Sequence, residues 1–368
     1  MKKLSLVLLV LALSLPLFAQ GPAEKQMQDS NFYRATDANG RTLQLGEKPT
    51  SVMVAGKAAV MPANALFLFP EVKEMELQLA KTDQGLGDFF NLLRPSLNDK
   101  SRFPQNASVE EIASKNPELV LLKATHYESL AKKLDQLGVP NFTMNLETYA
   151  EWQREIVELG KLLKNTSRAQ EILSLYENRL ANIQENVKTL SDKDRKRVLL
   201  LQGVSSDNAN SFKIAPDSWM QTWMVDQVGA NAVWKGANTA SSGWSTVSFE
   251  QIAAWDPQVI YIVSYNSPTD SFIEEIYSSS LWAGLQAVQA NRVKAAPADV
   301  MSYMQPVSSW ILGAEWMAKD LYPHLFPTLD MEKQVRSFYT EMYNITGNET
   351  LDYLVGRFNA SIALNTRE

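Results

Sequence analysis

The sequence contains no cysteine and only two histidines among 368 residues. The lack of cysteine excludes disulfide bonds, thiolate metal sites, cysteine nucleophiles and a bacterial lipid anchor, which is attached through a cysteine. With two histidines, a bare zinc or manganese site would need several carboxylates to converge. No basic patch stands out in a chain of net charge −6, so we expect no nucleic-acid partner.

Long apolar runs are also missing, except at the N-terminus. There a basic pair, Lys2 and Lys3, precedes an apolar run over residues 4–15, and the small residue Ala19 follows. This pattern predicts a secretory signal peptide over residues 1–19. The alternative is a retained anchor helix, but the run is too short to span a bilayer. We therefore expect a periplasmic or otherwise exported protein that is soluble after cleavage near Ala19.

Short apolar segments alternate with helical patterns in two regions of the chain. A hairpin with its turn at Asn39-Gly40 opens the first region. Predicted strands then occupy residues 51–55, 118–123, 141–144, 197–201, 257–263 and 292–296, while residues 202–212 are expected to form a loop. Strands that alternate with helices predict parallel sheets, and hence the α/β class.

A helical segment separates the two regions. Apolar residues recur at helical spacing over residues 148–190, interrupted only by Asn165-Thr166-Ser167, and no glycine or proline cluster occurs. We expect a rigid connector here. The predicted organisation is a signal peptide at 1–19, an N-terminal α/β lobe at 30–147, a helical connector at 148–190, and a C-terminal α/β lobe with C-terminal helices at 191–368.

An internal repeat supports two similar lobes. Residues 108–120 match residues 248–260 without a gap, with Ser, Glu, Ile, Ala and Pro identical. Each copy reads as a helix with a capping box, a proline turn and a buried strand. Two unrelated units that share common capping signals are the alternative. The 140-residue offset, with the connector in between, favours a true repeat.

These motifs resemble a known family. The hairpin and first strand at 37–56, the two repeat copies and the helix at 310–326 occur in the order found in periplasmic binding proteins of iron–siderophore, haem and cobalamin importers. The resemblance covers the chain from about Asp37. It implies two α/β lobes joined by one long helix, a ligand cleft between them, and delivery to the membrane permease of an ABC importer.

The resemblance also implies that two glutamates contact arginines of the permease. They are Glu110 and Glu250, which occupy the same position in the two repeat copies. The simpler alternative is that a glutamate at a helix start is favoured by the helix dipole and needs no partner.

The ligand should bind beyond the carboxyl ends of the parallel strands. The candidate ligand-binding residues there are mostly aromatic, with few charges: Lys57, His126, Tyr127, Trp219, Trp244, Tyr265, Tyr303 and Met304. Such a set suits a large, flat or greasy ligand rather than a bare cation. We expect a metal chelate, with a ferric siderophore first, haem or cobalamin next, and a molybdate-like oxyanion last. His126 could instead be a solvated polar residue, and Trp244 a core residue.

No catalytic constellation stands out. Gly243-Trp244-Ser245 lacks the full nucleophile-elbow pattern, and Gly56-Lys57 lacks the phosphate-loop spacing. We therefore expect a monomeric binding protein that is not an enzyme and has no cofactor of its own. An exported chelatase with the same fold is the alternative from another class, and turnover would distinguish it. A cell-envelope interaction protein would be expected to carry long repetitive tracts, and the sequence has none.

Overall fold

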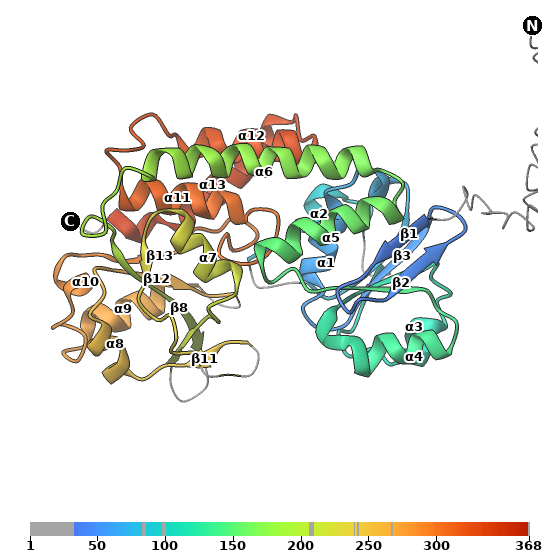
Figure 1. Cartoon of the computed structure of the whole chain (residues 1–368), viewed down its shortest axis with the longest axis horizontal. Coiled ribbons are helices and arrows are strands. Elements are labelled where there is room, and N and C mark those ends of the chain that lie inside the picture. Colours follow the sequence, from blue (N-terminus) through green and yellow to red (C-terminus); the bar gives the residue numbers. More distant parts are fainter. Residues whose placement is uncertain are drawn as a thin grey trace, which may run out of the picture.

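The computed structural model describes residues 33–82, 86–97, 101–205, 210–238, 240, 243–265 and 268–366. The predicted signal peptide lies outside these residues and stays a prediction. Two α/β lobes lie side by side, and a long helix crosses from one to the other (Figure 1). Within the described part of the chain, no helix is both long enough and apolar enough to cross a membrane.

The N-terminal lobe is built on a five-stranded, all-parallel sheet of order β5-β4-β3-β6-β7. Its strands are β3 (Ser51–Ala55), β4 (Glu76–Ala80), β5 (Arg102–Phe103), β6 (Leu119–Lys123) and β7 (Asn141–Met144). The predicted hairpin is formed by β1 (Tyr33–Thr36) and β2 (Thr42–Leu45), with Gly40 at a φ of +77° in the turn. The helices are α1 (Val60–Phe67), α2 (Phe89–Leu93), α3 (Val109–Ala113) and α4 (Lys132–Gln136), the last preceded by a π-helical turn at Tyr127–Ala131.

Both faces of this sheet are buried, as parallel sheets require. Along β3, Val52 and Val54 belong to the main core of the protein, whereas Met53 and Ala55 belong to a smaller core. The smaller core also contains residues of α3 and α4, so these two helices cover the outer face. Because successive side chains of a strand point to opposite faces of the sheet, these apolar residues are divided between the two cores.

The C-terminal lobe has a mixed sheet of order β11-β9-β8-β12-β13. Its strands are β8 (Arg197–Ser205), β9 (Asn210–Ile214), β10 (Asn231–Ala232, paired with β8), β11 (Ser245–Thr246), β12 (Val259–Val263) and β13 (Val293–Ala295). Strands β8, β12 and β13 are parallel, whereas β9 and β11 pair antiparallel. Its helices are α7 (Met220–Gln227), α8 (Phe249–Trp255), α9 (Asp270–Ser278), α10 (Gln286–Gln289), α11 (Trp310–Leu321), α12 (Met331–Tyr343) and α13 (Asn348–Ser361).

The helical segment between the lobes consists of two helices, α5 (Tyr149–Leu162) and α6 (Thr166–Val187). Thr148 caps α5 in a capping box, and the Asn165 side chain caps α6 by accepting a hydrogen bond from the Arg168 N–H. Helix α5 packs beside β1 of the N-terminal lobe, so α6 alone crosses to the other lobe (Figure 1). Its 22 residues give a length of about 33 Å.

The sequence repeat is also a structural repeat. Ser108 and Ser248 cap α3 and α8, each in a complete capping box. Just before the strand that follows, the Glu118 side chain accepts a hydrogen bond from the Thr50 N–H, and the Gln258 side chain accepts one from the Arg197 N–H. In both copies, this hydrogen bond links the repeat to the start of the neighbouring strand, which is β3 in one lobe and β8 in the other.

The lobes are joined by more than α6. The Phe89 ring of the N-terminal lobe contacts the Tyr343 ring of α12, with ring centroids 5.3 Å apart. The Ser308 N–H, in the buried loop before α11, donates to Asn64 Oδ1 of α1 at 2.6 Å. These contacts lie on the α6 side of the molecule and make the main core continuous through both lobes.

Candidate functional site

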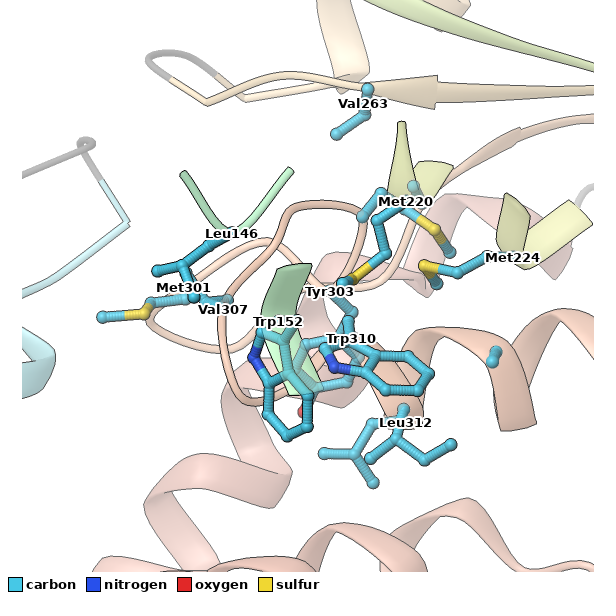
Figure 2. Packing of buried hydrophobic residues seen from close by; sticks show 14 of the residues in the cluster. Leu146, Trp152, Met220, Met224, Val263, Met301, Tyr303, Val307, Trp310 and Leu312 are labelled. Carbon is cyan, nitrogen blue, oxygen red and sulfur yellow. The ribbon is translucent and has the colours of Figure 1, made fainter. Parts of the chain in front are cut away.

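The carboxyl ends of the strands meet at the seam between the lobes. Leu146 and Glu147 follow β7, and the Glu147 carbonyl oxygen accepts a hydrogen bond from the N–H of Met220, the first residue of α7, at 2.7 Å. Figure 2 shows Leu146 beside Met301 and Val307, with Met220 and Val263, the last residue of β12, on the other side of the same region. These buried apolar residues belong to the main core beneath the strand ends.

Three aromatic residues of the C-terminal lobe form a row, which we call the aromatic wall: Trp219, Trp244 and Tyr265. The ring centroids of Trp219 and Trp244 are 6.1 Å apart, those of Trp244 and Tyr265 are 6.2 Å apart, and both pairs meet edge to face. All three side chains are partly exposed. Trp244 therefore packs against the core, as the alternative expected, and still keeps accessible ring surface.

The Tyr265 hydroxyl fixes one end of the wall. It donates to the Met304 carbonyl oxygen at 2.8 Å, and burial raises the pKa of this hydroxyl, so it remains protonated. Met304 therefore contacts Tyr265 through its backbone carbonyl oxygen, whereas the Met304 side chain is fully buried.

On the N-terminal lobe, Lys57 and His126 lie together. Gly56 has a φ of +83°, and a Cβ at this position would lie 2.7 Å from the His126 ring, so only glycine allows the approach. His126 Nε2 is 3.2 Å from the Lys57 carbonyl oxygen, and Nδ1 is 3.3 Å from Ser129 Oγ. Burial, helped by the Lys57 ammonium, lowers the pKa of His126, so the imidazole is neutral at pH 7. The Lys57 side chain is exposed.

Two other candidates occupy packing positions. The Tyr127 ring packs on the smaller core, with the Arg41 guanidinium 5.2 Å from its centroid. Tyr303 is fully buried, donates its hydroxyl to Asp299 at 2.9 Å, and stacks on Phe358. The structure thus brings Trp219, Trp244 and Tyr265 into one row and pairs Lys57 with His126, while Tyr127 and Tyr303 contact other partners.

Sequence reasoning missed a buried polar cluster at the seam, which we call the polar seam: Lys123, Glu147 and Gln221. Lys123 Nζ lies 2.7 Å from Glu147 Oε1, and the two residues are 2% and 7% exposed. Gln221, 2% exposed, donates through Nε2 to the Met304 carbonyl oxygen at 3.2 Å. Burial raises the pKa of Glu147 against the opposing effect of Lys123. Of these three residues, only Lys123 is unusual in the sequence, because it is a charged residue at the end of an apolar strand.

The described residues do not form a site for a bare metal ion. Nowhere among them do three or more His, Asp or Glu side chains gather closely enough to bind one. A cavity of about 500 Å³ lies between the two lobes beside α6, at a different place from the strand ends. Its lining residues include Phe67, Arg94, Arg168 and Met342. The candidate residues offer ring surface on the C-terminal lobe, and an exposed ammonium and a neutral imidazole on the N-terminal lobe.

The two repeat glutamates lie on exposed helix starts. Glu110 and Glu250 are in the first turns of α3 and α8, which lie on the side of the molecule away from α6 (Figure 1). Hydrogen bonds from the backbone, together with the Ser108 or Ser248 hydroxyl, lower the pKa of each carboxyl group. Both are therefore ionised at neutral pH.

Comparison with known proteins decides the family. Residues 100–300, more than half of the chain, match the periplasmic binding protein family. This chain belongs to that family. The molybdate-binding protein MolA of Haemophilus influenzae is 24% identical over 327 residues, which cover 82% of this periplasmic binding protein and 90% of MolA. An uncharacterised ABC transporter substrate-binding lipoprotein, YvrC of Bacillus subtilis, is 25% identical over 271 residues, or 72% and 82% of the two chains.

Solved structures share the two-lobed fold. A periplasmic solute binding protein of Veillonella parvula superposes with a TM-score of 0.69 at 22% identity, covering 91% of this chain and 99% of that one. MolA bound to molybdate gives 0.68 at 18% identity, with coverage of 85% and 98%. CeuE of Helicobacter pylori, in complex with nickel and histidine, gives 0.68 at 17% identity, with coverage of 88% and 99%. The fold class and the family predicted from the sequence are thus confirmed, and the protein is a solute-binding protein of the kind that serves ABC importers.

Proposed function

We propose that this periplasmic binding protein captures a metal chelate of the ferric-siderophore type and delivers it to the membrane permease of an ABC importer. The observation that carries the proposal is the aromatic wall. Trp219, Trp244 and Tyr265 offer adjoining, partly exposed rings on one lobe, and such surfaces bind the organic shell of a chelate better than a small ion.

The remaining parts of the proposal follow from this role. Lys57 and His126 contact the ligand from the N-terminal lobe, Lys57 as a cation and His126 as a neutral imidazole. The protein acts as an exported monomer after removal of residues 1–19, without turnover of its ligand. Glu110 and Glu250 dock to the permease.

Molybdate is the second candidate. The similarity to MolA favours it, because that similarity extends over 90% of the MolA chain. An oxyanion would require several convergent donors, however, and the aromatic wall would contribute little to its binding.

A tryptophan-fluorescence titration tests the proposal. We expect saturable quenching with ferric desferrioxamine B, because its iron and organic shell would lie against Trp219 and Trp244. The proposal ranks haemin, cobalamin and molybdate below it as ligands. Trp244→Ala should weaken binding by on the order of 1–3 kcal/mol. Trp255→Ala is the matched control, since this partly exposed tryptophan ends α8, outside the aromatic wall.

Two outcomes would contradict the proposal. Saturation by molybdate alone would favour the second candidate. No response to any of these ligands, together with tight binding of free zinc, would mean that the protein binds bare cations.

A further inference from the structure

Two buried acceptor atoms at the seam have no partner. Glu147 Oε2 and Gln221 Oε1 accept no hydrogen bond from any described residue, although both residues are more than nine-tenths buried. The two residues come from opposite lobes, and the Glu147 carbonyl oxygen accepts from the N–H of Met220, the residue beside Gln221. A buried acceptor without a partner is destabilising, so two at one point of the seam require an explanation.

We propose that these two oxygens form a subsite for a hydrogen-bond donor carried by the ligand, with an ammonium group favoured over a neutral N–H or O–H. This inference rests on the proposed capture of a chelate. Lys123 holds the Glu147 carboxylate through Oε1, which leaves Oε2 without a partner among the described residues. The Gln221 Nε2 atom is already engaged by Met304, which leaves its Oε1 to accept.

Tyr265 connects this subsite to the aromatic wall. Its ring lies edge to face with Trp244, and its hydroxyl is 3.4 Å from Gln221 Nε2. The negative charge of Glu147 is also close enough to act on this hydroxyl and raise its pKa further. A chelate stacked on the wall therefore has the polar seam next to it, and a donor group projecting from its organic shell meets two acceptors there.

The chemistry of the subsite selects among ligands. Two acceptors, one of them on a carboxylate, attract a donor and repel an oxyanion. The Lys123 ammonium cancels much of the Glu147 charge, but its N–H groups are engaged by Glu147 and by the Asn145 carbonyl oxygen, so it offers no donor to an oxyanion. The subsite thus favours a chelate that carries an amine over molybdate, which presents only acceptor oxygens at neutral pH.

The test uses a matched pair of ligands, ferric desferrioxamine B with its free terminal ammonium and the same complex acetylated at that nitrogen. Wild-type protein should bind the parent complex about 10-fold or more tightly than the acetylated one, since a charge-assisted hydrogen bond is lost. Glu147→Gln and Gln221→Met should each remove most of this preference. Gln227→Met is the control. Gln227 lies on the same helix, but its side chain contacts Gln184, so this substitution should leave the preference for the parent complex unchanged.

Each alternative result has its own meaning. Equal affinity of wild-type protein for the two complexes would overturn the subsite and leave the proposed function standing, whereas failure of both to bind would overturn both. A melting temperature of Gln221→Met well below that of wild type, with the preference intact, would show that Gln221 is structural. A melting temperature close to that of wild type with the preference lost supports the subsite, because the Met304 carbonyl oxygen that loses the Gln221 donor keeps the Tyr265 hydroxyl.

Discussion

Trp310→Ala is expected to lower the free energy of unfolding by about 3–5 kcal/mol. Trp310 is fully buried, and its ring lies 5.1 Å from that of Tyr176, 5.9 Å from that of Trp152 and 5.6 Å from that of Trp223. These residues come from α6, α5 and α7, so the substitution opens a cavity where four helices, including α11, meet. Urea unfolding followed by circular dichroism measures the change.

Trp310→Phe is the matched control. The indole N–H of Trp310 has no hydrogen-bond partner among the described residues, so phenylalanine loses ring area but no hydrogen bond. We expect it to cost less than half as much as alanine. Equal costs for the two substitutions, or a cost below about 1 kcal/mol for alanine, would contradict this description of the packing.

The double variant Glu110→Ala/Glu250→Ala should reduce uptake through the cognate importer by about 10-fold or more while ligand affinity stays unchanged. Both carboxylates are exposed and ionised, lie on equivalent helix starts of the two lobes, and lie outside the aromatic wall and the polar seam. A pair of charges on a two-lobed body fixes orientation as well as encounter rate at the permease. Transport into proteoliposomes measures uptake, and ligand titration of the same protein measures affinity.

The control must remove the same charge elsewhere. Glu177→Ala/Glu185→Ala does so on α6, on the opposite side of the molecule, where both side chains are exposed (Figure 1). Normal uptake by the Glu110/Glu250 variant, or an equal loss in the control, would contradict the docking role and leave the two glutamates as helix-start residues.

Much of the fold could be predicted because local signals agreed with the global arrangement. Ser108 and Ser248 formed the expected capping boxes, and the repeat predicted equivalent strands in the two lobes. Strand β3 has the predicted bounds, since an apolar run between Thr50 and Gly56 leaves little choice. The expected interruption of the connector at Asn165-Thr166-Ser167 is also present, since Asn165 caps α6 after a turn in which Lys164 adopts a φ of +52°.

Other elements were missed because their sequences carry weak signals. Residues 202–212 were expected to form a loop, but β8 extends to Ser205 and β9 begins at Asn210. Within β9 only Phe212 and Ile214 are buried apolar residues, too few for a clear alternation. Its pairing with β8 and the contacts of Phe212 with Phe272 and Trp282 depend on residues distant in the sequence, which composition does not reveal.

The candidate site was predicted only in part for a related reason. Strand-end loops nominated Trp219, Trp244 and Tyr265 as ligand-binding residues. The structure places their rings in one row, and their contact with a ligand stays a prediction. Glu147 and Gln221, by contrast, look like ordinary polar residues in the sequence. Their burial results from contact between the two lobes, and no local pattern encodes such a contact.

Native mass spectrometry of the protein isolated from iron-limited cells tests the central claim most directly. Gentle desorption retains a tightly bound ligand, and its mass and isotope pattern identify both the metal and the organic shell. The account predicts one ligand per chain, with the isotope pattern of iron and the mass of a chelate that carries a free amine. A molybdenum isotope pattern with the mass of a bare oxyanion would contradict it.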